Sequence, residues 1–487
     1  MTDTLLNDSQ FVDAAALQKL TPRTFSCDSK FLYEGDSRFD STSYSAEAWR
    51  AIEAIESVPG FRSTVGELCG TIWHPVQNQA RSNFKRIYVD KEHGVPFLGS
   101  REMFFLPLRA EKFLSKKIPK LQDLMVPESW LLISRSGTVG NVLYVNKILS
   151  KHALTDDAIR IQPTKVLGGY LYALLASKFG QPLVTTGGYG STISHLEPKH
   201  ISSIPVPLVD GKIQQMIHDK IIQAYERRDE ANTLLDEADA ELHRVMGVEP
   251  FDGSDVEYFG NAQEVKAFEI DSTELSERFD ATNHVPLVRS AVHKLQMAKY
   301  PLTTLGRKCS EITIPFRFKR NYATQEQGIP YLLPAQLGLF RPYGQKAIAA
   351  SQVRENPKYL LRQGQVLLTT DGTVGRVHLV TRRMHNSFGS NNMARIWDAH
   401  TDMGFVYAFL ATPFGKLQVC REIYGGVVDH INEPHITSVQ IPDIPPAEQR
   451  HVGDTVREAF ELRDQANDLE DEAIGQIERL IENAGRP

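Results

Sequence analysis

The side chains best suited to specific polar contacts lie in and beside two glycine-containing loops. Gly137-Thr138-Val139-Gly140 recurs 235 positions later as Gly372-Thr373-Val374-Gly375. Glycine in such a loop lets backbone amides approach a phosphate, and threonine adds a hydroxyl donor. Arginine pairs bidentately with guanine, and asparagine with adenine. The candidates in these loops are Arg135, Ser136, Gly137, Thr138, Asn141, Asp371, Gly372, Thr373 and Arg376. A plain hairpin turn would explain the glycines equally well.

Two clusters combine basic and aromatic residues. They are Phe84-Lys85-Arg86 with Tyr88, and Phe318-Lys319-Arg320 with Tyr322. Positive charge beside an aromatic face suits a nucleic acid, although a solvated protein surface can have the same composition. Glycine-rich stretches at 185–192 and 423–426 are expected to face a groove of the ligand. The remaining polar candidates, from these stretches and from a segment that differs between the repeats, are Tyr189, Ser191, Thr192, Asn391 and Asn392.

Motifs of enzymatic catalysis are absent from the sequence. It contains no phosphate-binding loop of an ATPase, no G-x-S-x-G, no H-E-x-x-H and no [DN]-P-P-[YF] turn. The four cysteines stand far apart, without a C-x-x-C pair or a histidine at ligand spacing. We therefore predict no catalytic residue, no metal and no cofactor, and we interpret His195 and His430 as framework residues.

The loops belong to a longer internal repeat. At the displacement of 235 the register continues without insertion for about a hundred residues, through His195 with His430 and Arg228-Asp229 with Arg463-Asp464. Upstream the displacement becomes 234, where Phe84-Lys85-Arg86 matches Phe318-Lys319-Arg320. A collinear series of this length indicates a duplicated unit.

Each unit reads as a mixed domain followed by a helix. Short strands are predicted at 130–134, 141–145, 365–370 and 376–380, and small helices at 170–178 and 404–411. Proline-rich exits at 204–207 and 441–446 place extended hinges after each domain.

A seven-residue apolar rhythm follows each hinge. Three alanines in each seam allow close backbone approach, which favours pairing of the two helices in an antiparallel coiled coil. The seam residues are Ile217, Ile221, Arg228, Leu235 and Leu242 in the first helix and Val456, Arg463 and Ile477 in the second. Arg228 and Arg463 are expected to fix the register by pairing with acidic residues such as Glu470. Two amphipathic helices, each lying on its own domain, remain the alternative.

The charge distribution separates the helices from the domains. The chain of 487 residues has a formal net charge of -6, and acidic residues predominate in the two helices. The remainder is mildly basic. This charge is compatible with a nucleic-acid ligand, but it is weaker than that of a strongly basic DNA-binding domain. The first twenty residues lack a basic start followed by an apolar run, and no stretch has the length of a spanning helix, so we expect a cytoplasmic protein.

Taken together, the repeated motifs make the chain resemble the specificity subunit of a type I restriction-modification system. The resemblance rests on the two loops, on Arg38-Phe39-Asp40 and Arg278-Phe279-Asp280, on the exits after His200 and His435, and on the helices. It implies an α+β fold with two tandemly repeated mixed α/β target-recognition domains, each followed by a long helix. The implied boundaries are 1–210 and 248–446 for the domains, and 211–247 and 447–487 for the helices.

The resemblance also implies a function in DNA methylation and phage defence. Such a subunit is non-catalytic, reads a bipartite asymmetric site on double-stranded DNA, and holds two modification (methyltransferase) subunits, joined by restriction/translocase subunits in the full complex. No membrane partner is expected. A protein-interaction scaffold that does not bind DNA, and the specificity partner of a related phage-defence methyltransferase, remain the alternatives.

Overall fold

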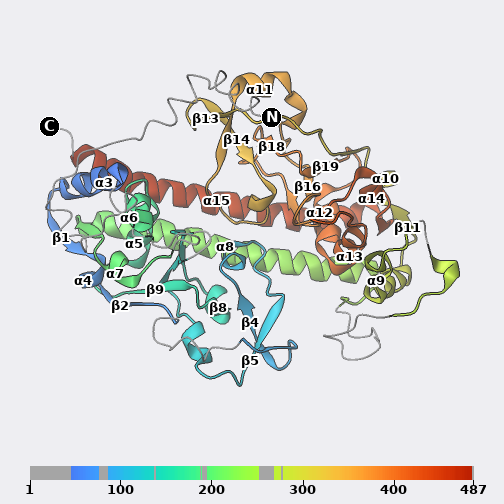
Figure 1. Cartoon of the computed structure of the whole chain (residues 1–487), viewed down its shortest axis with the longest axis horizontal. Helices are drawn as coiled ribbons and strands as arrows, with labels where there is room; N and C mark the ends of the chain where they lie inside the picture. The colour runs from blue at the N-terminus through green and yellow to red at the C-terminus, as the bar shows by residue number, and fades with distance from the viewer. Residues whose placement is uncertain are drawn as a thin grey trace, which may run out of the picture.

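Two long helices form the centre of the computed structural model, which describes residues 45–75, 86–135, 139–186, 188, 195–251, 268–275 and 278–484. Helices α8 (Gly211–Met246) and α15 (Pro446–Ala484) run side by side along the long axis, with mixed α/β structure on either side of them (Figure 1). Below, the first domain denotes the described residues of 45–210 and the second domain those of 268–445.

The first domain contains two four-stranded sheets. One has the order β2-β9-β6-β7 and the other β3-β5-β4-β8. The strands of the first sheet are β2 (Cys69–Trp73), β9 (Ala158–Pro163), β6 (Leu131–Ser134) and β7 (Val142–Tyr144). Those of the second are β3 (Tyr88–Val89), β5 (Lys112–Ser115), β4 (Gly94–Leu98) and β8 (Ala153–Leu154).

The second domain repeats this topology. Its sheets have the orders β12-β19-β16-β17 and β13-β15-β14-β18, and in each domain a single parallel pair, β4 with β8 or β14 with β18, stands among antiparallel ones. The first sheet contains β12 (Glu311–Thr313), β19 (Met393–Trp397), β16 (Val366–Thr369) and β17 (Val377–Leu379). The second contains β13 (Tyr322–Ala323), β15 (Lys346–Ala349), β14 (Gly328–Leu332) and β18 (Phe388–Gly389). The repeat of the sequence is therefore a repeat of structure.

Short strands and helices complete each domain. Strand β1 (Phe61–Thr64) pairs with β10 (Pro205–Leu208), and β11 (Leu302–Thr304) pairs with β20 (Gln440–Pro442). The helices are α3 (Ala46–Glu56), α4 (Val65–Leu68), α5 (Gly168–Ala176), α6 (Gly180–Thr186), α7 (Pro198–Ser202), α9 (Pro286–Gln296), α10 (Leu305–Lys308), α11 (Ala350–Glu355), α12 (Met403–Ala411), α13 (Pro413–Arg421) and α14 (Glu433–Thr437). The strands and small helices predicted from the sequence are confirmed to within about two residues at each end, the usual uncertainty of such boundaries.

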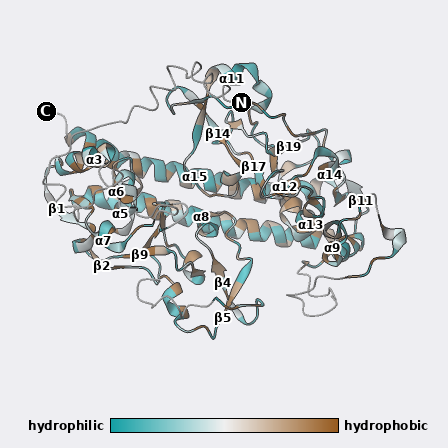
Figure 2. Ribbon diagram, in the orientation of Figure 1, coloured by the Kyte–Doolittle hydropathy of each residue, from teal (hydrophilic) through white to brown (hydrophobic). Residues whose placement is uncertain are grey.

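Helices α5 and α12 join the sheets to the long helices. Both are apolar on all sides and almost completely buried, as expected of helices inside a core. Figure 2 shows them as hydrophobic segments against the mainly hydrophilic outer faces of α8 and α15. At the start of α12, a side chain on Gly404 would collide with the backbone of Gly453, so two glycines allow α12 to touch α15.

The long helices are antiparallel. Lys220 pairs with Glu472 and Arg228 with Glu470, and Glu241 Oε1 lies 3.5 Å from His451 Nε2. Residue numbers thus rise along α8 while those of the partners in α15 fall. Asp210 caps α8 by accepting a hydrogen bond from the Lys212 amide, and Gly247 ends it in the left-handed region with φ 68°. The seam residues named from the sequence are buried: Ile217, Ile221, Arg228, Leu235, Leu242, Val456, Arg463 and Ile477. At ~1.5 Å per residue the helices are ~55 Å long.

The two buried arginines of the seam differ in their surroundings. Arg228 forms the ion pair with Glu470 and also donates to Asn467 Oδ1 at 3.0 Å. Arg463 does not use a carboxylate from the other helix. It donates instead to the carbonyls of Leu339 and Phe340, at 2.9 and 3.1 Å. Only one of the two seam arginines therefore has the interhelical acidic partner that the sequence suggested.

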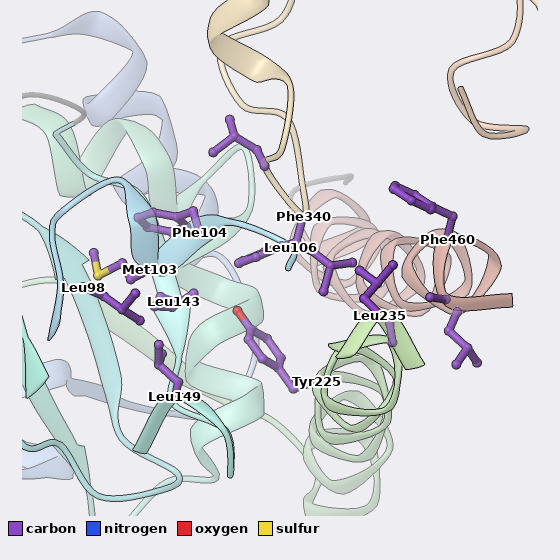
Figure 3. Packing of buried hydrophobic residues seen from close by; sticks show 14 of the residues in the cluster. Leu98, Met103, Phe104, Leu106, Leu143, Leu149, Tyr225, Leu235, Phe340 and Phe460 are labelled. Carbon is purple, nitrogen blue, oxygen red and sulfur yellow. The ribbon is translucent and has the colours of Figure 1, made fainter. Parts of the chain in front are cut away.

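The domains meet at equivalent positions. Phe105 and Leu339, which correspond at the displacement of 234, form an antiparallel bridge. Figure 3 shows Phe104, Leu106 and Phe340 beside Tyr225 of α8, next to the two long helices. The contact relates the two halves of the chain by an approximate twofold axis.

Candidate nucleic-acid interface

Three segments of the second domain meet beside the end of β16. The Thr370 amide donates to the Asn392 carbonyl at 3.1 Å, and the Ile431 amide donates to the Thr370 carbonyl at 3.0 Å. The Gly372 amide donates to the Asp429 carbonyl at 2.9 Å. The structure therefore joins the loop 370–376, the segment 390–392 and the segment 423–431 into one surface. Six of the sequence candidates, Asp371, Gly372, Thr373, Arg376, Asn391 and Asn392, lie in these segments.

A carboxylate and a histidine hold the loop 370–376 in place. Asp371 Oδ1 lies 2.6 Å from His430 Nδ1, and Asp371 Oδ2 accepts a hydrogen bond from the Thr370 hydroxyl at 2.7 Å. Gly372, with φ +74°, and Thr373 are exposed at the tip of the loop. The Gly372 amide is bonded to the Asp429 carbonyl in this conformation, and contact of the loop with a phosphate stays a prediction. The exposed hydroxyl of Thr373 remains available to a ligand.

The basic cluster of the second domain reaches the same surface. Arg320 Nη2 donates to Asn391 Oδ1 at 3.3 Å, and Arg320 Nε donates to the Tyr331 hydroxyl at 2.9 Å. Lys319 is exposed next to it. The ring of Tyr322 is half exposed, and the Lys346 ammonium lies 4.8 Å from its centroid. A cation, two amides and an exposed hydroxyl thus lie in adjoining segments.

The first domain has a similar arrangement with more acidic partners. Arg86 pairs with Asp156, and their side chains are 40% and 18% exposed. Tyr88 is partly exposed on β3, with the Lys112 ammonium 5.6 Å from its ring centroid. Asn141 follows Gly140 and is partly buried, and its amide donates to the Ser134 hydroxyl at 3.0 Å. Seven of the candidates lie outside the described residues: Lys85, Ser136, Gly137, Thr138, Tyr189, Ser191 and Thr192.

Arg135 does not extend toward a ligand as expected. Its side chain is only 12% exposed and lies 3.3 Å from carboxylate oxygens of both Asp157 and Glu197. Its Nε also donates to the Leu196 carbonyl at 3.1 Å. These contacts tie the end of β6 to segments 22 and 62 residues away, and contact of Arg135 with a base stays a prediction.

Arg376 is also displaced from its expected place. Its guanidinium lies 4.8 Å from the centroid of the Phe105 ring, in the contact between the two domains. Gly375, with φ +86°, turns the chain just before it. Burial lowers the pKa of Arg376, with the nearby Arg101 adding to the effect. Arg376 thus belongs to the contact between the domains and not to the surface around Asn391.

Two residues of the candidate surface were not singled out from the sequence. Val427 is fully exposed and Val428 nearly half exposed, next to Tyr424 of the predicted stretch 423–426, which is also nearly half exposed. The pair Gly425-Gly426 was the only signal, and Gly425 has φ +115°. An apolar loop tip of this kind is able to press against bases or sugars.

A buried arginine underlies each candidate segment. Arg160 and Arg395 are repeat counterparts, each 1% exposed. Arg160 donates to the Ala158 and Thr155 carbonyls at 2.7 and 3.0 Å, and Arg395 donates to the Met393 and Gly389 carbonyls at 2.8 and 3.0 Å. Burial lowers the pKa of each to about 10. Carbonyl oxygens thus anchor segments 154–157 and 389–392 to a cation below them.

In the described part of the chain, no group of three or more His, Cys, Asp or Glu side chains could hold a metal ion. None of the described helices combines the length and apolar character needed to cross a membrane.

Comparison with known proteins gives one family match. Residues 89–237 match the family model described as the type I restriction modification DNA specificity domain. No curated protein matches the chain.

Three solved structures share low sequence identity with the chain. A type I restriction-modification system S subunit from M. genitalium shares 11% identity, with 88% of this chain and 97% of that chain covered and a TM-score of 0.34. The HsdS subunit from Thermoanaerobacter tengcongensis shares 16% identity over 88% and 96%, with a TM-score of 0.27. A structure described under complex assembly and conformational transition of the type I R-M system shares 14% over 88% and 98%, with a TM-score of 0.28. Likeness at this level does not establish a shared arrangement.

Proposed function

We propose, from the match of residues 89–237 to the type I restriction modification DNA specificity domain, that the whole chain is the DNA-binding specificity subunit of such a system. Its two domains each read one short half-site of duplex DNA. Because the domains differ in sequence, the half-sites differ, and the complete site is split and asymmetric. The chain performs no chemistry itself and directs methyltransferase subunits to DNA.

The convergence of three segments in the second domain carries this proposal. Arg320 supplies positive charge, the partly buried Asn392 supplies an amide, and Thr373 supplies a hydroxyl, while Asn391, only 5% exposed, bonds the side chains of Arg320 and Asn392. These are the groups that recognise phosphates and base edges. Equivalent segments in the first domain contain Arg86 and Asp156. Readers related by an approximate twofold axis would dock about one helical turn, or ~10 base pairs, apart.

The long helices serve as spacer and partner-binding element in this proposal, paired as an antiparallel coiled coil. A groove between α8 and α15 is lined by Glu226, Glu230, Asp468 and Glu472 together with Arg227. Glu230, Asp468 and Glu472 are paired with Arg227, Arg382 and Lys220, so the groove offers a partner subunit mainly ion pairs and polar groups. We assign it, with the adjoining domain faces, to two modification subunits. Restriction/translocase subunits join in the full complex.

Methylome sequencing tests the proposal directly. The chain is expressed with its modification subunits in a host that lacks other methyltransferases, and the methylated motifs are compared with those of the subunits alone. A new split, asymmetric motif is expected. A continuous palindromic motif, or no new motif while the methyltransferase is active, would contradict the two-reader function. Capture of partner subunits without any affinity for duplex DNA would favour a protein-interaction scaffold.

A further inference from the structure

The two candidate readers differ in charge at equivalent positions. Arg86 corresponds to Arg320, and Asp156 corresponds to Asn391. In the first domain the guanidinium contacts a carboxylate, since Arg86 Nη2 bonds Asp156 Oδ1. In the second, the same nitrogen of Arg320 donates to the amide oxygen of Asn391 at 3.3 Å. The geometry is retained while the acid is replaced by a neutral amide.

The replacement extends to the neighbouring acids. Asp157 and Glu197, which flank Arg135, correspond to Asn392 and Asn432. Arg135 itself corresponds to Thr370. Three carboxylates of the first domain therefore have asparagine counterparts in the second. The second surface described above contains two acids, Asp371 and the exposed Asp429; Asp371 faces His430, and neither makes an ion pair with Arg320 among the described residues.

The sequence beside the arginines increases the difference. Arg317, an exposed residue of the second domain, corresponds to Asn83. Among the described residues Arg320 makes no ion pair, whereas Arg86 makes one with Asp156. A phosphate approaching Arg320 meets an uncompensated cation, but one approaching Arg86 also meets the carboxylate of Asp156. When two opposite charges are in contact, their electric fields largely cancel for a phosphate that is still farther away.

We propose that Arg320 is the phosphate contact that anchors the second domain on DNA, and that Asp156 cancels this function of Arg86 in the first domain. The first domain then offers a carboxylate acceptor, held in place by Arg86, to base amino groups such as cytosine N4. This inference rests on the proposed function, because it assumes duplex DNA as the ligand. Of the salt-dependent affinity that Arg86 and Arg320 contribute, most would therefore come from Arg320 in the second domain.

Reciprocal exchange of the two residues is the experiment. The full-length variants Asp156→Asn and Asn391→Asp are titrated against a fluorescein-labelled duplex of mixed sequence, between about 50 and 200 mM salt. Each phosphate contact contributes about 0.9 to the slope of log K against log salt concentration. Asp156→Asn is expected to steepen the slope by about 0.9, and Asn391→Asp to flatten it by about as much. The double variant should return close to the wild-type slope.

Further variants keep the test decisive if Asn391→Asp does not fold. Arg320→Gln is expected to flatten the slope by about 0.9, and the matched Arg86→Gln to flatten it by less. Arg227→Gln, on the exposed face of α8, controls for the loss of one positive charge. Equal slopes for both single exchanges and wild type, or a flatter slope for Asp156→Asn, would overturn the inference. If the wild-type chain bound no duplex at any salt concentration, the proposed function itself would fail.

Discussion

Phe105 and Leu339 face each other across the contact between the domains, although 234 positions separate them. The Leu106 amide donates to the Gly338 carbonyl at 2.8 Å, and the Phe340 amide donates to the Phe104 carbonyl at the same distance. Each hydrogen bond is the repeat image of the other. The approximate axis of the molecule therefore passes between these two residues, and the domains are joined through main-chain atoms as well as through α8 and α15.

The contact depends on Phe340. Its buried ring lies 6.0 Å from that of Phe104 and 6.2 Å from that of Tyr225, with the Arg228 guanidinium 4.1 Å from its centroid. Phe340→Ala is expected to lower the free energy of unfolding by about 3 to 5 kcal/mol, since it leaves a cavity between domains and helices. Urea unfolding followed by fluorescence measures this loss. The exposed Phe316 provides the control, and Phe316→Ala should change stability by no more than about 0.5 kcal/mol. Equal effects of the two substitutions would refute the prediction.

Glu470 compensates the buried guanidinium of Arg228 and contacts the partly buried one of Arg341, which also pairs with Asp471. It pairs with Arg228, lies 3.3 Å from Arg341 Nη1, and accepts a hydrogen bond from the Tyr172 hydroxyl at 2.6 Å. Glu470→Gln removes the carboxylate charge and is expected to destabilise the protein by about 3 to 5 kcal/mol, as for other broken buried pairs. The exposed pair Arg227–Glu230 serves for comparison, since Glu230→Gln should cost less than about 1 kcal/mol. Similar shifts of the urea midpoint in both variants would show that Glu470 has no special role.

His378 gives the stability a predictable pH dependence. Burial lowers its pKa well below the ordinary value, with Arg463 adding to the effect, so the folded protein keeps the imidazole neutral. Below a pH of about 6.5 the unfolded chain binds a proton that the folded chain does not, and stability falls by about 1.4 kcal/mol per pH unit. Leucine stands at the equivalent position 143, so His378→Leu is a conservative change. Its stability should fall less steeply than that of wild type between about pH 6.5 and 5. Parallel pH curves would contradict this assignment.

Leu235 and Leu242 test the seam of α8. Both are buried, and replacement of each by alanine is expected to cost about 2 to 5 kcal/mol. The double variant should show a lower unfolding temperature and weaker assembly with modification subunits. Leu234, only partly buried beside Leu235, offers a comparison substitution with a smaller effect. Unchanged melting and assembly of the double variant would mean that these leucines do not support the helix pair.

Arg135 is expected to matter for folding of the first domain. Arg135→Ala removes the hydrogen bond to the Leu196 carbonyl and leaves Asp157 and Glu197 without their shared cation. Loss of charge-assisted hydrogen bonds of this kind costs about 1.5 to 3 kcal/mol. Thermal unfolding should therefore begin earlier in this variant. A change in sequence preference at wild-type stability would instead restore a direct reading role.

The sequence predicted the elements better than the contacts between them. The glycine loops located β6, β7, β16 and β17, and the heptad rhythm located α8 and α15, because both signals are local. The partners of Arg135 stand 22 and 62 residues away, and the contact of Arg376 with Phe105 spans the two domains. Such pairings depend on how the sheets pack, and no local pattern encodes them. The pairing of Asp371 with His430 was missed for the same reason.

The charge in the helix seam also distinguishes the chain from other copies of itself. The counterpart of Glu470 in α8 is Leu235. If α8 helices from two copies met in the register observed here, each Arg228 would face a leucine and lose its carboxylate. An unpaired buried charge of this kind costs about 3 to 5 kcal/mol. The ion pair thus favours pairing of α8 with α15, and it disfavours pairing of α8 with a second α8.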